Sequence, residues 1–202
     1  AMPGSEKGEA LCLHAAKHPH PMRTADTLAA KHPQRPLDQN REYWRSDEVS
    51  ADFWDSAEEY LGLHERQNRQ QLKELTGVDP VRTEWCAAFV NAILELEGIP
   101  NNDDHKYPLT ARAFLDWGNS INPQDILPGD IVVFPRGNKG WQGHVGFYVG
   151  RHASGKWVIL GGNQSNSVRY DLYDPKRALG IRRGKRPVEA TGSMPKLFGS
   201  FE

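Results

Sequence analysis

The hydrophobic and polar positions of the chain change their period near residue 128. Before that point, apolar side chains recur three and four positions apart, a spacing typical of helices that bury one face. The pattern predicts a first helix with Ser50 as its candidate cap, and two of the later helices end at glycine. We expect the four helices at about 51–63, 65–75, 83–98 and 110–117.

After residue 128 the apolar period becomes two. Runs of β-branched and aromatic residues alternate there with Gly, Pro and Asn, which is typical of short strands joined by turns. The runs predict five strands, at 130–135, 144–150, 156–162, 167–173 and 179–183. Helices followed by consecutive strands predict an α+β domain, in which an antiparallel sheet of about five strands packs on the helix at 83–98.

The first 50 residues differ from the rest in composition. They are polar, interrupted by proline and rich in histidine, but these histidines have no acidic or cysteine partner at the spacing of metal ligands. We therefore expect an amino-terminal arm over 1–50 that is partly disordered or packed on the domain. The domain is expected over 51–187 and a carboxy-terminal tail over 188–202. We expect neither a metal nor another cofactor.

Composition limits the classes of function. The 202 residues are 38% hydrophobic and 25% charged, which suits one globular domain with some additional chain. A formal net charge of -1 argues against nucleic-acid binding, although the basic run from Lys176 to Arg186 is either a solvated edge or attracted to an anionic surface. No apolar run reaches the ~18 residues of a membrane span, and the amino terminus lacks the order of a secretory signal. We therefore expect a protein that is made in the cytoplasm without a signal peptide and does not insert into membranes. We also expect a monomer.

The helix predicted at 83–98 begins with a cysteine close to its amino terminus. With Thr83 as the cap, Cys86 takes the third helical position, where unpaired backbone N–H groups and the helix dipole favour a thiolate. A thiolate is the nucleophilic form of cysteine. The competing interpretation is a buried cysteine that acts as a small hydrophobic residue on the apolar face. The other cysteine, Cys12, is far away in sequence, so the two do not indicate a disulfide framework.

A nucleophilic thiol needs a base, and His144 opens the second predicted strand after the glycine-bracketed stretch GWQG. A histidine at a strand end is more often an ordinary polar residue, but the helix-start cysteine changes that expectation. The next strand ends in LGGNQ, which places Asn163 or Gln164 beside His144 if the two strands form a hairpin. The order Cys86, His144, Asn163 matches a triad in which a neutral amide orients the imidazole.

Five motifs carry a resemblance to a known superfamily. They are TEWCAAFVN, ARAFLDWG, LPGDIVVF, GHVGFYVG and VILGGNQ, in that order. Together they resemble bacterial and phage cell-wall hydrolases of the papain-like NlpC/CHAP superfamily, especially the branch with Trp-Cys-Ala-Ala-Phe around the nucleophile. The resemblance implies that Cys86 is the nucleophile, His144 the general base and Asn163 the orienting residue, with Gln164 as its neighbouring rival. It also implies a peptidoglycan substrate, cleaved within the stem peptide or between muramic acid and the peptide.

Four further residues are candidates for binding the substrate. Trp85 and Trp141 flank the two catalytic candidates, and either suits a groove wall, while core packing is an equal expectation for Trp85. Glu65 and Asn68 resemble positions that recur upstream of the cysteine in this branch, and the alternative for them is helix capping or surface pairing. Asp130 follows Pro-Gly at a strand start, which favours a turn-stabilising role over a catalytic one.

The resemblance implies two biological settings. One is an antibacterial effector of a contact-dependent, type VI-like secretion system, with a cognate immunity protein as partner. The other is a phage lysis enzyme. In both, the enzyme acts in the periplasm or cell wall after delivery. The alternative activity on the same Cys-His scaffold is that of a protein glutamine deamidase or a transglutaminase-like toxin.

Overall fold

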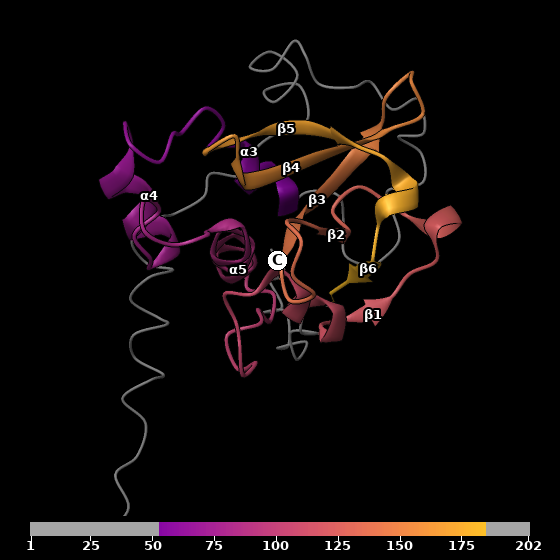
Figure 1. Ribbon diagram of the computed structural model, residues 1–202, viewed down its shortest axis with the longest axis horizontal. Coiled ribbons are helices and arrows are strands. Elements are labelled where there is room, and N and C mark those ends of the chain that lie inside the picture. The colour runs from indigo at the N-terminus through magenta and orange to yellow at the C-terminus, as the bar shows by residue number, and fades with distance from the viewer. Residues whose placement is uncertain (1–52, 185–202) are drawn as a thin grey trace, which may run out of the picture. The chain divides into compact units, whose positions relative to one another are not determined.

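The structure, a computed structural model, describes residues 53–184 (Figure 1). Three α-helices come first in this range, α3 (Phe53–Glu58), α4 (Arg69–Thr76) and α5 (Cys86–Leu96). The 3-10 helices η2 (Ala111–Asp116), η3 (Pro123–Asp125) and η4 (Pro175–Arg177) lie in later connections. No helix within the described range is long and apolar enough to cross a membrane. The predicted arm, its Ser50 cap and the predicted tail fall outside the described residues.

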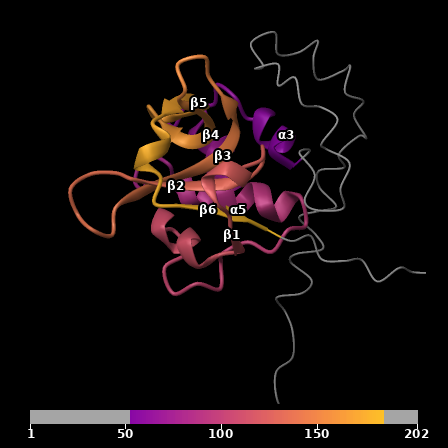
Figure 2. The same cartoon turned by 90° about the vertical axis from the view of Figure 1, so that its right-hand side faces the viewer.

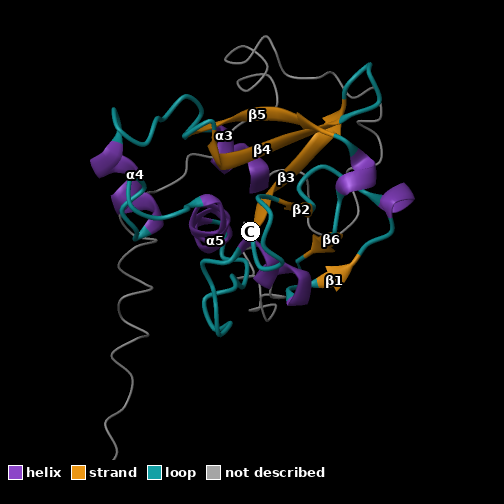
Figure 3. Ribbon diagram, viewed as in Figure 1, coloured by secondary structure: helices purple, strands orange, loops and turns teal. Residues whose placement is uncertain are grey.

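The strands form one antiparallel sheet in the order β1-β6-β2-β3-β4-β5 (Figure 3). Their bounds are β1 (Asn119–Ser120), β2 (Ile131–Pro135), β3 (Gly143–Arg151), β4 (Trp157–Gln164), β5 (Ser167–Tyr173) and β6 (Gly180–Arg183). The five strands that the period of two predicts are all present, and the α+β class is confirmed. The pattern does not predict β1, because a two-residue strand is too short to show a period.

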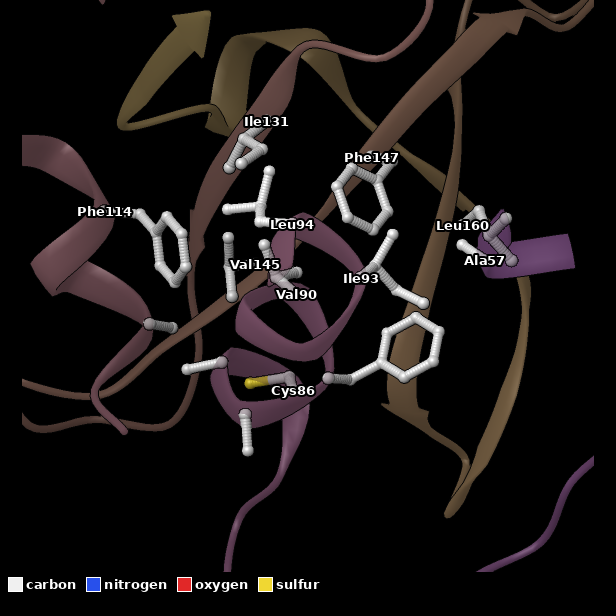
Figure 4. Packing of buried hydrophobic residues seen from close by; sticks show 14 of the residues in the cluster. Ala57, Cys86, Val90, Ile93, Leu94, Phe114, Ile131, Val145, Phe147 and Leu160 are labelled. Carbon is white, nitrogen blue, oxygen red and sulfur yellow. The ribbon is translucent and has the colours of Figure 1, made fainter. Parts of the chain in front are cut away.

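The core lies between α5 and the sheet. Nine consecutive residues of α5, from Cys86 to Leu94, are buried, because the helix packs on β3 and β4 and also contacts α3 and α4. Figure 1 shows α4 on the side of α5 that faces away from the sheet, and Figure 2 shows α3 above α5. Figure 4 shows Ile93 and Leu94 of this helix among the side chains of β3, including Phe147. Alternate residues of the strands form a second cluster on the opposite face of the sheet. Its buried members are Ile126, Val132, Phe134, Tyr148, Trp157, Ile159 and Ile181.

The helix that carries the cysteine starts later than the sequence predicts. α5 begins at Cys86, with Trp85 as its N-cap residue. Thr83 belongs to the preceding turn, where its backbone N–H donates to the carbonyl of Asp79 at 3.0 Å. The Asp79 side chain accepts the backbone N–H of Val81 at 3.2 Å, which closes the same turn. The Thr83 cap is therefore wrong, and Cys86 is the first residue of the helix rather than the third.

Asp130 has the structural role that its position after Pro-Gly predicts. One carboxylate oxygen accepts the backbone N–H of Leu127 at 2.8 Å and so closes the turn before β2. Both oxygens also accept N–H groups of Arg183 on β6, at 2.7 and 2.8 Å. Arg183, one member of the basic run, thus forms a buried ion pair with Asp130. Lys185 and Arg186 lie outside the described residues.

Gly162 lets β4 approach α5 closely, and we expect alanine there to destabilise the fold. A Cβ at this position would lie 2.5 Å from a ring carbon of Trp85 and 2.7 Å from the Cβ of Phe89. Overpacking of this kind costs about 1–3 kcal/mol in the free energy of unfolding. Urea denaturation measures it, with Gly140→Ala as the control, because a Cβ at Gly140 meets nothing within 4 Å. Equal stability of the two variants would contradict the close approach.

Candidate functional site

Cys86 lies at the amino-terminal end of α5 with its sulfur turned into the protein (Figure 4). Only 3% of the residue is exposed. Burial raises the pKa of the Cys86 thiol. Three weaker influences lower this pKa: the backbone N–H of Val145, the positive charge of Arg136 and the backbone N–H of Ala87. The sulfur therefore sits against β3 at the residue that follows His144. In this resting structure, the neutral thiol is favoured.

His144, the second residue of β3, has one ring nitrogen engaged and one without a partner. Its Nε2 lies 2.9 Å from Oε1 of Gln164, and its Nδ1 has no hydrogen-bond partner within the described part of the chain. The residue is 2% exposed. Burial lowers the pKa of His144 to about 4; the hydrogen bond to Gln164 opposes this shift and the charge of Arg136 adds to it. The imidazole is therefore neutral near pH 7.

The hydrogen bonds of Gln164 determine which nitrogen of His144 carries the proton. The amide nitrogen of Gln164 donates to the carbonyl of Ile159 at 3.1 Å and to the carbonyl of Arg169. Because carbonyls only accept, the NH₂ group must face them, and Oε1 must face the imidazole. Nε2 of His144 therefore donates to Oε1, and Nδ1 keeps its lone pair. Gln164 thus leaves Nδ1 as the nitrogen that can take a proton.

Asn163 does not take the place that the sequence assigns to it. Its backbone φ of 54° lies in the left-handed region, which turns the chain where the regular pairing of β4 and β5 is interrupted. The side-chain NH₂ of Asn163 donates to the carboxylate of Glu84 at 2.6 Å, not to His144. The contact predicted for Asn163 is therefore made by its rival Gln164. The catalytic roles of Cys86, His144 and Gln164 stay predictions.

Tyr173 covers the face of the imidazole, and the sequence pattern gives no sign of it. Its ring stacks on that of His144 at 5.5 Å between centroids and 9° between planes, and on Phe134 at 4.4 Å. Burial, the first of several influences, raises the pKa of Tyr173 to about 12. Tyr173 ends β5 and pairs with Trp157, at the end of β4 that is remote from Gln164. Only a strongly coiled sheet brings it to His144, so residue spacing alone does not predict the contact.

Arg136 is a second residue that the sequence does not single out. It follows β2, and its Nη2 donates to the carbonyl oxygen of Asn163 at 2.9 Å, while its Nη1 lies 3.5 Å from the Glu84 carboxylate. Asn163 is the neighbour of Gln164, the partner of His144, and Glu84 is two residues before Cys86, so Arg136 contacts the segments next to both catalytic candidates. A cation directly after a strand is typical of an exposed turn, which is why the pattern alone gives it no weight.

The two tryptophan candidates differ in exposure. Trp85 is fully buried, with its ring edge-to-face against Phe89 at 6.3 Å, so it packs in the core and does not line a groove. Trp141, in the connection from β2 to β3, is 62% exposed and remains available to a ligand. Within residues 53–184, no group of three or more His, Cys, Asp and Glu side chains could hold a metal ion.

Glu65 and Asn68 lie in the turn before α4, which begins at Arg69 rather than near residue 65. The side chain of Asn68 accepts the backbone N–H of His64 at 3.0 Å and closes this turn. The backbone N–H of Glu65 donates to the carbonyl of Asn166 at 2.9 Å, which fixes the turn against the β4–β5 connection. The contacts of Asn68 are those of a turn-forming residue, and a substrate role for either residue stays a prediction.

Replacing Gln164 with leucine is expected to lower the rate of amide hydrolysis by at least about tenfold. The imidazole then loses the acceptor that fixes its tautomer and orientation. The comparison variant is Asn163→Gly, which keeps the left-handed backbone and is expected to cost less. Hydrolysis rates on soluble stem peptide, together with circular dichroism to confirm folding, measure both. A larger loss in the Asn163 variant would contradict the pairing of Gln164 with His144.

The chain matches the family model "CHAP domain" over residues 78–163, which include Cys86 and His144 and end one residue before Gln164. It is similar in fold to an NlpC/P60 family protein from Bacillus cereus, with 17% identity and a TM-score of 0.45, over 69% of this chain and 41% of that one. It is also similar to NlpC1 from Trichomonas vaginalis, with 21% identity and a TM-score of 0.42, over 74% and 46% of the two chains.

The chain thus spans less than half of the length of either solved structure. None of the curated proteins compared with the chain matches it. The CHAP match contains Cys86, at the start of α5, and His144, at the start of β3. Residues 78–163, less than half of the chain, are therefore similar to a CHAP domain.

Proposed function

We propose that this protein hydrolyses an amide bond of the peptidoglycan stem peptide through a covalent intermediate on Cys86. The observation that carries the proposal is the state of His144. Its Nε2 is held by Gln164, and its Nδ1 is left with a free lone pair beside the strand residue that contacts the Cys86 sulfur. A CHAP domain with this arrangement has the nucleophile and the base that acyl transfer requires.

In the first step, the Cys86 sulfur attacks the carbonyl carbon of the scissile amide. The thiol proton passes to Nδ1 of His144 as the S–C bond forms, and on this proposal the two atoms come within hydrogen-bond distance when substrate is bound. Cys86 is the first residue of α5, so its backbone N–H has no partner within the helix. That group is the natural donor to the oxyanion of the tetrahedral intermediate.

In the second step, the C–N bond breaks and the protonated His144 gives its proton to the leaving amine. Water then attacks the thioester carbonyl, with Nδ1 of His144 taking one of its protons. Collapse of the second intermediate breaks the S–C bond, and the proton returns to sulfur. Gln164 holds the same Nε2–H throughout, so one tautomer serves both half-reactions.

Mass analysis of digested cell walls tests the proposed activity and names the bond. Purified sacculi are incubated with the full chain, and the soluble products are separated and weighed. Release of free stem peptides indicates cleavage next to muramic acid, whereas shortened peptides indicate an endopeptidase. No product from sacculi of several wall types, together with deamidation of glutamine in a protein substrate, would overturn the proposal in favour of the deamidase alternative.

We also propose that the protein acts in the periplasm as a delivered antibacterial effector. The support is chemical, because the stem-peptide bonds lie outside the cytoplasmic membrane. Expression in a Gram-negative host with and without an added periplasmic signal tests it. We expect lysis only with the signal, and protection by the product of a neighbouring immunity gene. Equal toxicity of both forms would contradict a periplasmic target, and lysis that no such partner prevents would favour a phage lysis enzyme.

A further inference from the structure

Three segments that surround the candidate site meet at one guanidinium. Arg136, from the connection after β2, donates through Nη2 to the carbonyl of Asn163 at the end of β4. Its Nη1 lies 3.5 Å from the carboxylate of Glu84, two residues before Cys86. Glu84 in turn accepts the side-chain NH₂ of Asn163 at 2.6 Å. The three side chains thus join the loop before α5, the β2–β3 connection and the strand end next to Gln164.

The contact between Arg136 and Glu84 is weak for an ion pair. At 3.5 Å it is longer than a charge-assisted hydrogen bond, and the Glu84 side chain is 79% exposed. Exposed pairs of this kind add little to stability, so another carboxylate that also accepts the Asn163 NH₂ can replace Glu84 at small cost. Nη1 of Arg136 is itself covered and makes no hydrogen bond within the described residues. A carboxylate that approaches more closely would supply the missing acceptor.

Because of where Arg136 lies, replacement of Glu84 by another carboxylate would affect which substrates the protein accepts. The guanidinium contacts Asn163, the neighbour of the Gln164 that holds His144, and Glu84, two residues before Cys86. A carboxylate bound in place of Glu84 would lie beside the segment that leads into Cys86. Cys86 and His144 are nearly fully buried, so a substrate has to displace something at the rim of the site to reach them. The exposed Glu84 side chain is held by the weak pair with Arg136 and by the hydrogen bond from Asn163, so a substrate carboxylate that takes over both contacts can displace it.

We propose that Arg136 selects substrates with a free carboxylate next to the scissile amide, and that Glu84 occupies this position until the substrate carboxylate replaces it. The inference rests on the proposed function. In a stem peptide, the D-glutamyl residue is linked through its side-chain carboxyl, so its α-carboxyl is either free or amidated. The predicted substrate class is therefore the stem peptide with free D-glutamate, in preference to the form with D-isoglutamine.

The experiment compares two soluble stem peptides that differ only in this group, free carboxylate against amide. With the unmodified protein, we expect kcat/KM to be about 10- to 100-fold higher for the free carboxylate, the range for one charge-assisted hydrogen bond. Arg136→Gln is expected to lower kcat/KM for the carboxylate peptide by about the same factor and to remove most of the preference. Glu84→Gln is expected to raise kcat/KM for the carboxylate peptide several-fold, because the competing charge is gone.

Lys139→Gln is the matched control, because it removes one positive charge from an exposed residue of the same connection. It is expected to leave the preference unchanged. An equal fall of kcat/KM for both peptides in Arg136→Gln would overturn the inference, since it would indicate a general effect on Cys86 or on the fold. Equal rates of the unmodified protein on both peptides would overturn it as well. Hydrolysis of neither peptide, nor of sacculi, would instead overturn the proposed function and this inference with it.

Discussion

Replacing Cys86 with alanine is expected to abolish hydrolysis of sacculi, with a loss of at least about 10⁴-fold in kcat. The substitution removes the sulfur that forms the thioester in the proposed mechanism, so binding and oxyanion stabilisation alone remain. Mass analysis of the peptides released per hour, at equal protein concentration, measures the loss. The matched control is Cys12→Ala, which removes the other thiol of the chain and is expected to retain full activity.

Folding has to be separated from chemistry in this test, because Cys86 is buried at the start of α5. Deleting one sulfur from the core leaves a small cavity, and we expect a cost of about 1 kcal/mol in unfolding free energy. A folded Cys86→Ala protein that still releases peptides would show that another residue is the nucleophile. A folded, inactive protein that binds stem peptide would support the assignment, since only the reacting atom is missing.

The fold could be predicted to a large extent because its signals are local. Alternating apolar residues predict β2 to β6 without reference to the rest of the chain. The sequence predicts the start of α5 two residues too early, because Thr83 is a good cap by residue type. Whether it caps the helix depends on Asp79, whose backbone carbonyl engages the Thr83 N–H in a separate turn. Cap identity is thus decided by a competing turn that residue preference does not describe.

The candidate site, too, could be predicted from the sequence only in part. Cys86 and His144 could be predicted because each stands at the start of an element, which a sequence pattern locates. The choice between Asn163 and Gln164 could not, because a left-handed backbone at Asn163 reverses which side chain faces the imidazole. Tyr173 reaches the site only through the coiling of the sheet, a property of the folded sheet rather than of any short stretch of sequence.

Asp130→Ala is expected to cause the largest loss of stability among the substitutions considered, about 3–5 kcal/mol in the free energy of unfolding. Asp130 is 2% exposed and receives three hydrogen bonds, one from Leu127 and two from Arg183. Alanine leaves the guanidinium of Arg183 in a largely covered position without its carboxylate. Urea denaturation at pH 7 measures the loss. Asp116→Ala, which removes an exposed aspartate 3.6 Å from His105, is expected to change stability by less than about 0.5 kcal/mol.

The double variant separates the ion pair from the fold of the turn. Burial raises the pKa of Asp130 more than Arg183 and the Leu127 N–H lower it, so burying this carboxylate is costly in itself. The pair as a whole therefore contributes less than the single substitution suggests, and most of the loss in Asp130→Ala comes from the charge left behind on Arg183. Asp130→Ala combined with Arg183→Met should then recover part of the stability that Asp130→Ala loses. A double variant less stable than the sum of the two single losses would show that the cost lies in the turn at Leu127 instead.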